Sequence, residues 1–346
     1  MLRRMLAASC AAVAAMTVTV GPAFACGGLI GPNGAVNLLR TTTLAGYHAG
    51  VEHYVTAFQF AGGGGAFGSL TPLPGVPSSV EKGGDWTLQR LVRETTPFRL
   101  EDTAFAAAPA AGEAEILMKV RIDALDVTVL KGGATEVGRW AADHGFRLPP
   151  DAPEVLDFYA RRSPIFLAAV FDADAAAERG QAIGDGTPVH VTIPTTNPWV
   201  PLRILALGKT GDERVEADVF LLTDRQPALL PQPTGLNGMR LAHSAPASDE
   251  LLADLRSDSG MTWVPGSGWL TKISLDGTAD QFTYDLAIDA SGFGTPSRVA
   301  AGFDLLPPPS GIDSAQQLAI VALLGAAALA FMTLARRRAV GLPAPW

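Results

Sequence analysis

The pattern of apolar and polar side chains predicts a chain built mainly from short strands. In 281–289, four apolar side chains at even positions alternate with polar or small ones at odd positions, the period of a strand with one buried face. Val51–Phe60 is rich in β-branched and aromatic residues, which also favours a strand. A glycine run at 62–65 then predicts a turn, with Ala66–Leu70 returning as the hairpin partner. Further strands are predicted at 116–122, 124–130, 165–171, 189–193, 202–207, 215–222 and 270–275.

Helical periodicity is confined to short segments. Asp85 is a suitable N-cap for a helix that ends at Glu94 and buries apolar residues three and four positions apart. Other helices are predicted near 135–144, near 153–161 and at Ser248–Leu255, with Ser248 as the cap. The proline-rich stretch Leu73–Pro77 reads as a loop, because proline cannot sit in a central strand. The list of elements predicts a β-rich α+β fold, with two packed antiparallel or mixed sheets.

The N-terminal end has the three parts of a secretory signal peptide. Arg3 and Arg4 precede an apolar run at 6–20, and Ala23-Phe24-Ala25 places small residues at the −3 and −1 positions. We therefore predict that residues 1–25 are removed and that the mature chain begins at Cys26. The alternative, a retained membrane helix, fits the short apolar run less well.

The C-terminal end predicts a membrane anchor. Residues 314–335 carry no charge, and Arg336 to Arg338 follow them directly. Roughly 20 apolar residues span a bilayer as a helix, and arginines stay on the cytoplasmic side. The predicted order is a domain at 26–306, a proline-rich spacer at 307–313, the transmembrane helix and a cytoplasmic tail at 336–346. The domain would then lie outside the cytoplasm, and the protein would be bound to the membrane through this one C-terminal helix.

Charge narrows the choice of ligands. Five of the 26 basic residues and one of the 34 acidic residues lie in the two ends, so 26–311 holds 21 basic and 33 acidic residues, a formal charge of −12. A strongly acidic domain without a basic patch argues against nucleic acid and against anionic lipid. No internal repeat and no linker of different composition divides 26–306, so a single domain is expected.

Cys26 is the one cysteine of the predicted mature chain, since Cys10 lies in the leader. Three roles stay open for it: lipid attachment, a nucleophile that uses its own α-amine as the base, or a plain terminal residue in a Cys-Gly-Gly turn. The preceding Ala-Phe-Ala departs from the usual lipid-attachment sequence. Cys26 is the candidate catalytic residue if the protein is an enzyme.

His48, Glu52 and His53 form the only cluster that resembles a metal site. In a strand, neighbouring side chains point to opposite faces, so Glu52 and His53 cannot readily share an ion. His48 and His53 are five positions apart and also have opposite parity. We therefore expect no metal and no cofactor here.

Other chemical signals are weak. The glycines of 62–68 lack the lysine and the helix of a phosphate-binding loop, and His144, His190 and His243 are scattered without partner spacing for a catalytic triad. No Gly-x-Ser-x-Gly elbow occurs. Trp263 and Trp269 flank a glycine-rich loop and could border a ligand groove, although a buried core position is the commoner use of tryptophan.

Several stretches resemble the bacterial family known as domain of unknown function 2330. They are Ala25-Cys-Gly-Gly28, 51–58, the Pro-Leu-Pro-Gly-Val-Pro loop within 67–77, 80–94 and Trp199–Leu207. The resemblance covers about 26–300 and implies an exported, envelope-associated protein, often anchored in the membrane. It implies no activity, cofactor or catalytic residue.

The sequence leaves catalysis open and favours a protein without it. The preferred hypothesis is an envelope protein that binds an unidentified partner or ligand, or has a structural role, on the outer face of the membrane. One alternative is a hydrolase or transferase that acts on envelope material through the Cys26 thiol. The other is a metal-binding surface protein.

Overall fold

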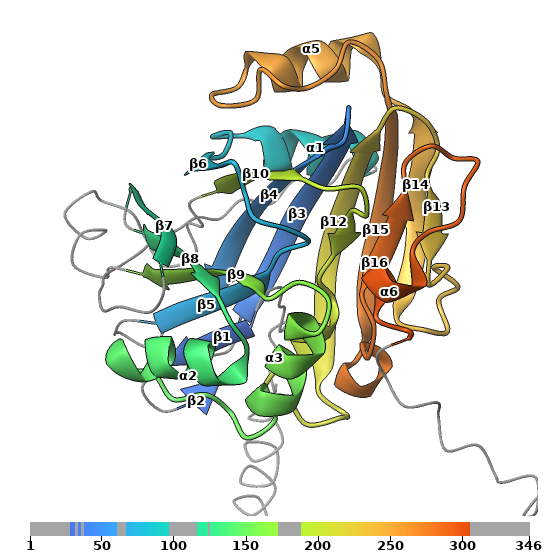
Figure 1. Cartoon of the computed structure of the whole chain (residues 1–346). Coiled ribbons are helices and arrows are strands. Elements are labelled where there is room, and N and C mark those ends of the chain that lie inside the picture. The colour runs from blue at the N-terminus through green and yellow to red at the C-terminus, as the bar shows by residue number, and fades with distance from the viewer. Residues whose placement is uncertain are drawn as a thin grey trace, which may run out of the picture. The chain divides into compact units, whose positions relative to one another are not determined.

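The computed structural model describes residues 28–31, 34–35, 38–60, 67–96, 116–123, 125–171 and 188–304. The chain divides into two compact units, Met1–Phe303 and Asp304–Trp346, and every element below belongs to the first. The first unit is a β-rich α+β fold, as predicted, but its strands form three sheets rather than two. Figure 1 shows the strands and the short helices around them.

The largest sheet has seven strands and is mixed. Its order is β14-β15-β12-β3-β4-β10-β6. The β12–β3 pair is parallel, and the other pairs are antiparallel. The strands are β3 (Leu38–His48), β4 (Val51–Phe60), β6 (Ser79–Lys82), β10 (Val189–Pro194), β12 (Arg214–Thr223), β14 (Met239–Pro246) and β15 (Trp269–Thr278).

The other two sheets are antiparallel. One has six strands in the order β2-β1-β5-β9-β8-β7, and the other has three in the order β11-β16-β13. Every residue of β9 is buried, in agreement with its central place and its unbroken apolar sequence. The strands are β1 (Gly28–Gly31), β2 (Gly34–Ala35), β5 (Phe67–Pro72), β7 (Ile116–Ile122), β8 (Leu125–Lys131), β9 (Ile165–Phe171), β11 (Trp199–Val200), β13 (Ala228–Leu230) and β16 (Leu286–Asp289).

Five short α-helices accompany the sheets in the described part of the chain. They are α1 (Thr87–Thr95), α2 (Ala134–Asp143), α3 (Ala152–Ala160), α5 (Asp249–Ser257) and α6 (Arg298–Ala301). Helices α1 and α5 contact each other and pack on one face of the seven-stranded sheet. Helix α2 lies beside α3 near the six-stranded sheet (Figure 1). The apolar core between the sheet and the α1–α5 pair is built from Leu44, Val55, Leu88, Leu91, Phe220, Leu222, Leu251, Leu252, Leu255, Met261, Val264 and Leu270.

The helix ends show one confirmed prediction and one correction. Ser248 caps α5 and accepts a hydrogen bond from the Leu251 N–H at 3.1 Å. Asp85 does not cap α1. Instead, Asp258 from the segment after α5 accepts hydrogen bonds from the N–H groups of Asp85 (3.1 Å) and Trp86 (3.0 Å). A carboxylate that is distant in sequence therefore accepts hydrogen bonds from the two N–H groups just before α1, and the local sequence could not reveal this partner.

Three strand predictions were wrong in ways that the tertiary structure explains. The segment after the glycine run does not pair with β4; β5 pairs with β1 and β9, because β10 and β3 occupy both edges of β4. Within 202–207, residues Arg203–Ala206 form a 3₁₀ turn. In 281–289, only Leu286–Asp289 is a strand. The last two deviations share a cause, since the Asp285 carboxylate accepts hydrogen bonds from the N–H groups of Leu202 and Arg203.

The predicted leader at 1–25, Cys26, the spacer at 307–313, the span at 314–335 and the tail at 336–346 lie outside the described residues. Within the described ranges, no helix is both long and apolar enough to cross a membrane.

Candidate functional site

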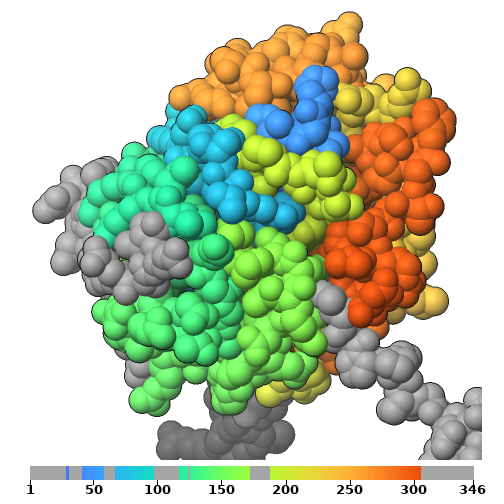
Figure 2. Space-filling model, in the orientation of Figure 1, coloured from blue at the N-terminus to red at the C-terminus, as the bar shows by residue number. Residues whose placement is uncertain are grey.

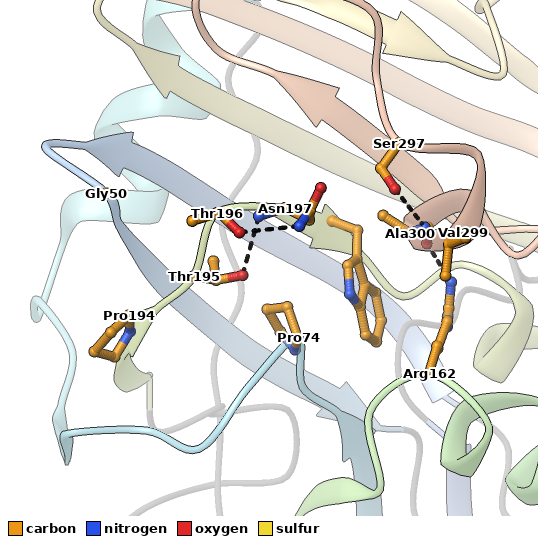
Figure 3. Close-up of a pocket in the computed structure, with 11 residues that line it drawn as sticks. Gly50, Pro74, Arg162, Pro194, Thr195, Thr196, Asn197, Ser297, Val299 and Ala300 are labelled. Atoms are coloured by element: carbon orange, nitrogen blue, oxygen red, sulfur yellow. Dashed lines mark hydrogen bonds between the residues drawn. The ribbon is translucent and has the colours of Figure 1, made fainter.

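A pocket of about 650 Å³ lies where β3 turns into β4. Its walls come from segments that are far apart in sequence: the β3–β4 turn, the loop after β5, the end of β10 with the loop to β11, the start of β11, the turn after α3 and helix α6 with its cap. These segments lie beside one another in Figure 2, and Figure 3 shows their side chains. The lining residues are Gly50, Pro74, Arg162, Pro194, Thr195, Thr196, Asn197, Trp199, Ser297, Val299 and Ala300.

The β3–β4 turn fixes one wall of the pocket. Ala49 and Gly50 both have positive φ, at 51° and 83°, as a two-residue turn between antiparallel strands requires. The Gly50 carbonyl accepts a hydrogen bond from the Thr195 N–H at 3.1 Å. The Tyr47 hydroxyl donates to the Thr195 carbonyl at 2.9 Å. Backbone and side-chain bonds therefore hold the β10–β11 loop against the hairpin.

Neutral hydrogen-bonding groups face the pocket. The Asn197 side-chain amide donates to the Thr196 hydroxyl at 3.0 Å, and the Asn197 N–H donates to the Thr195 hydroxyl at 3.2 Å. On the opposite wall, the Ser297 hydroxyl accepts from the Ala300 N–H at 3.1 Å and caps α6. The exposed Thr196 and Asn197 side chains are the ones most accessible to a ligand.

Arg162 is the one ionisable side chain among the described lining residues, and it is already neutralised. Its guanidinium side chain is 2% exposed and pairs with the fully buried carboxylate of Asp285. It also donates to the Ala300 carbonyl (Figure 3). Burial lowers the pKa of Arg162 to about 10, so the group keeps its charge at neutral pH. The pocket therefore offers little net charge to a ligand.

Aromatic rings enclose the same guanidinium. Its central carbon lies 4.1 Å from the ring centroid of Trp199, 4.7 Å from that of Phe158 and 4.9 Å from that of Tyr159. The Tyr159 hydroxyl donates to Asp285 at 2.9 Å and accepts from the Ile204 N–H at 2.9 Å. A paired and hydrogen-bonded charge of this kind holds α3, β11 and the 3₁₀ turn in one arrangement, so the base of the pocket is rigid.

Glu52 lies beneath this region in the interior. Its cross-strand neighbours are Tyr47 and Ile193, it is fully buried, and neither carboxyl oxygen has a hydrogen-bond partner among the described residues. Burial, partly offset by the nearby backbone N–H of Trp199, which does not meet hydrogen-bonding geometry, raises the pKa of Glu52 to about 8. The carboxyl group is therefore mostly protonated at neutral pH.

His48, Glu52 and His53 were not expected to share a metal ion, and the structure corrects one step of the argument behind that expectation. Glu52 and His53 do lie on opposite faces of β4. His48, however, lies on β3 on the far side of a two-residue turn, and Gly46 is the register partner of His53. His48 and His53 therefore share a face, because sequence parity does not carry across a hairpin. Among the described residues, no group of three or more His, Cys, Asp or Glu side chains could hold a metal ion.

The other singled-out side chains have separate surroundings. His48 Nδ1 lies 2.6 Å from an Asp224 oxygen, and His144 Nδ1 lies 2.7 Å from the Trp140 carbonyl oxygen at the end of α2. His243 is on β14. Trp269 donates to the Ser244 hydroxyl at 2.9 Å. Trp263 stacks on His53, and neither tryptophan lines the pocket.

Sequence reasoning missed the residues that build the pocket. Arg162 and Asp285 are 123 positions apart, and each sits in an ordinary local pattern. Asp285 gave no signal, because the alternating pattern of 281–289 places it on the polar face of the predicted strand. Asn197 and Thr195 gave no signal, since polar residues in a short loop are expected.

Comparison with known proteins places the chain in a family. No curated protein matches it. One similar solved structure is baculovirus P35, which is 9% identical; the match covers 74% of this chain and 97% of that chain, with a TM-score of 0.39. A second is a mutated baculovirus P35 after caspase cleavage, which is 8% identical; the match covers 72% of this chain and 99% of that chain, with a TM-score of 0.37. These values carry no inference about this chain. The model of the family described as "Uncharacterized protein conserved in bacteria (DUF2330)" matches residues 22–226, more than half of the sequence, and the chain therefore belongs to the DUF2330 family.

Proposed function

We propose that residues 26–306 are the extracytoplasmic domain of a membrane-anchored bacterial envelope protein that binds a ligand or partner without catalysis. The apolar segments at 6–20 and 314–335, with arginines before the first and after the second, support export and anchoring. The acidic composition of the domain fits a solvated protein outside the membrane.

The observation that carries the binding proposal is the pocket beside the β3–β4 turn. Ligand sites are commonly concave and preformed, with a few polar groups that fix orientation. Here Thr196, Asn197 and Ser297 supply neutral hydroxyl and amide groups, and the Arg162–Asp285 pair keeps the base in place. A small neutral ligand rich in hydroxyl or amide groups matches this lining better than an ion does.

Fragment mapping by NMR tests the proposed pocket. A library of neutral hydroxyl- and amide-bearing fragments should shift the Asn197 side-chain resonances of the full-length chain. Thr196→Trp fills the pocket and should abolish these shifts. Thr210→Trp is the matched control, because Thr210 is exposed and precedes β12 at the end of that strand opposite to the pocket. Fragments that cluster elsewhere, or that still bind after Thr196→Trp, would contradict the assignment.

Topology and processing need a separate measurement. Protease added to intact cells should digest 26–306 and spare 336–346, and intact mass should show a chain that starts at Cys26. A thiol probe should react slowly with Cys26. A fast-reacting, low-pKa thiol would instead favour the enzymatic alternative.

A further inference from the structure

Two histidines and a tryptophan form a layered cluster on the face of the seven-stranded sheet that α1 and α5 cover. His53 Nδ1 lies 3.0 Å from His190 Nε2, so one ring donates a hydrogen bond to the other. The indole of Trp263 lies flat on His53, with ring centroids 4.0 Å apart and planes 2° from parallel. It also lies over His190 at 5.8 Å.

Trp263 belongs to the connection between α5 and β15, residues 258–268. Gly46 on β3 makes room for it, since a Cβ atom there would lie 2.3 Å from the indole. On either side of Trp263, Met261 and Val264 are buried in the core beneath α1 and α5. The stacking of Trp263 on the two histidines therefore keeps the 258–268 connection packed over apolar side chains of the core.

The hydrogen bond between the rings depends on their protonation. A neutral pair has one donor and one acceptor at the contact, whereas two protonated rings are both donors and cannot bond to each other. His190 is 4% exposed, and its Nδ1 has no partner among the described residues. Protonation of His190 would thus create a buried charge whose Nδ1–H has no hydrogen-bond acceptor among the described residues.

The charged groups around the pair do not offset protonation. On β3, His48 shares the face and is paired with Asp224. On β6, exposed Glu81 is the register partner of His190. In and near the connection, Arg256 donates to the Pro265 carbonyl, and Asp258 binds the start of α1. Burial, followed by His190 and His48, lowers the pKa of His53 to about 4, and burial lowers that of His190 to about 4.

We propose that the His53–His190 pair is an acid-sensitive latch for the 258–268 connection. While both rings are neutral, they hold Trp263 against the sheet. When both are protonated, their hydrogen bond is lost, the connection leaves the sheet, and the apolar surface beneath α1 and α5 is uncovered. The remaining sheet stays folded, so acid changes the surface that the domain presents.

Hydrogen exchange on the full-length chain tests the latch. After correction for intrinsic exchange rates, protection of 258–268 should fall at least tenfold between pH 7 and pH 4, while β9 and β12 keep theirs. In His53→Asn/His190→Gln, the amides occupy the places of Nδ1 and Nε2, can hydrogen-bond to each other, and do not titrate. This variant should keep 258–268 protected at pH 4.

Three results would overturn the latch: simultaneous loss of protection in β9 and β12, unchanged protection of 258–268 at pH 4, or equal loss in the double variant. The last would point to Asp258, which the variant retains. If the double variant does not fold, NMR of the wild-type imidazoles decides. The NMR resonance of the Trp263 indole N–H must then shift over the same pH range in which the His53 and His190 imidazoles titrate. Titration of the imidazoles without that shift would refute the latch.

Discussion

Glu52→Gln should stabilise the domain at neutral pH and remove a specific part of its pH dependence. The wild-type carboxyl is fully buried without a hydrogen-bond partner among the described residues. Burial raises its pKa to about 8 from the ordinary value of 4.5. Folding therefore opposes ionisation of this group, whereas the glutamine side chain has nearly the same shape and never ionises.

The magnitude follows from linkage. The unfolded chain releases the Glu52 proton near pH 4.5, but the folded chain keeps it until about pH 8. Glu52 therefore makes its full contribution to the free energy of unfolding below pH 4.5. As pH rises from 4.5 to 8, that contribution falls by about 1.4 kcal/mol per pH unit. At pH 7 the loss is about 3 kcal/mol on that scale. Any cost of burying the glutamine amide is the same at every pH.

The assay is urea unfolding of the full-length chain between pH 5 and pH 8. The difference in unfolding free energy between Glu52→Gln and wild type should grow by about 3 kcal/mol across this range in favour of the variant. Glu81→Gln is the matched control, because Glu81 is exposed on β6, and its difference should stay nearly flat. Parallel curves for wild type and Glu52→Gln would refute the buried, protonated carboxyl.

Three further substitutions test the packing. Asp258→Ala removes the acceptor at the start of α1 and should cost about 1–2 kcal/mol in urea unfolding, with exchange protection lost first in α1. Gly46→Ala places a methyl group against Trp263 and should cost about 1–3 kcal/mol, while Gly138→Ala on α2, whose methyl group would meet only Leu148 at an ordinary 3.7 Å, should leave Trp263 fluorescence unchanged. Asp285→Asn leaves the Arg162 charge buried without its partner and should cost about 3–5 kcal/mol; a loss below 1 kcal/mol would contradict a structural role for the pair.

Much of the fold could be predicted from local patterns. The bounds of β4, β7 and β9 and the cap of α5 follow from residue type and periodicity, because each element is decided by its own side chains. Strand β3 was missed although it is central. Its sequence, Leu-Leu-Arg-Thr-Thr-Thr-Leu-Ala-Gly-Tyr-His, mixes threonines with apolar residues, and buried threonine pairs such as Thr43–Thr56 are satisfied only across the sheet.

The pocket and the latch could not be predicted, because both arise from pairings between distant segments. Asp285 determines the local structure of 202–206 from more than 80 residues away. The metal-site reasoning failed on one point for a related reason. It treated His48 and His53 as members of one strand, whereas the Ala49–Gly50 turn places them on neighbouring strands with a common face.

Adjacent residues on opposite faces of β4 give the domain two opposed responses to pH. Glu52 lowers stability as pH rises from 4.5 to about 8. His53 and His190, whose folded pKa values lie below the unfolded value of 6.5, lower stability as pH falls from 6.5 to about 4. Between pH 4.5 and 6.5, the stability gained from the two histidines as pH rises exceeds the stability lost from Glu52. The combined contribution of the three residues to the unfolding free energy is therefore greatest near pH 6.5. Glu52→Gln should therefore extend the stable range upward only, and His53→Asn/His190→Gln downward only. If either variant moved both limits in urea unfolding, the two faces of the strand would not titrate independently, and the separate roles assigned to them would be wrong.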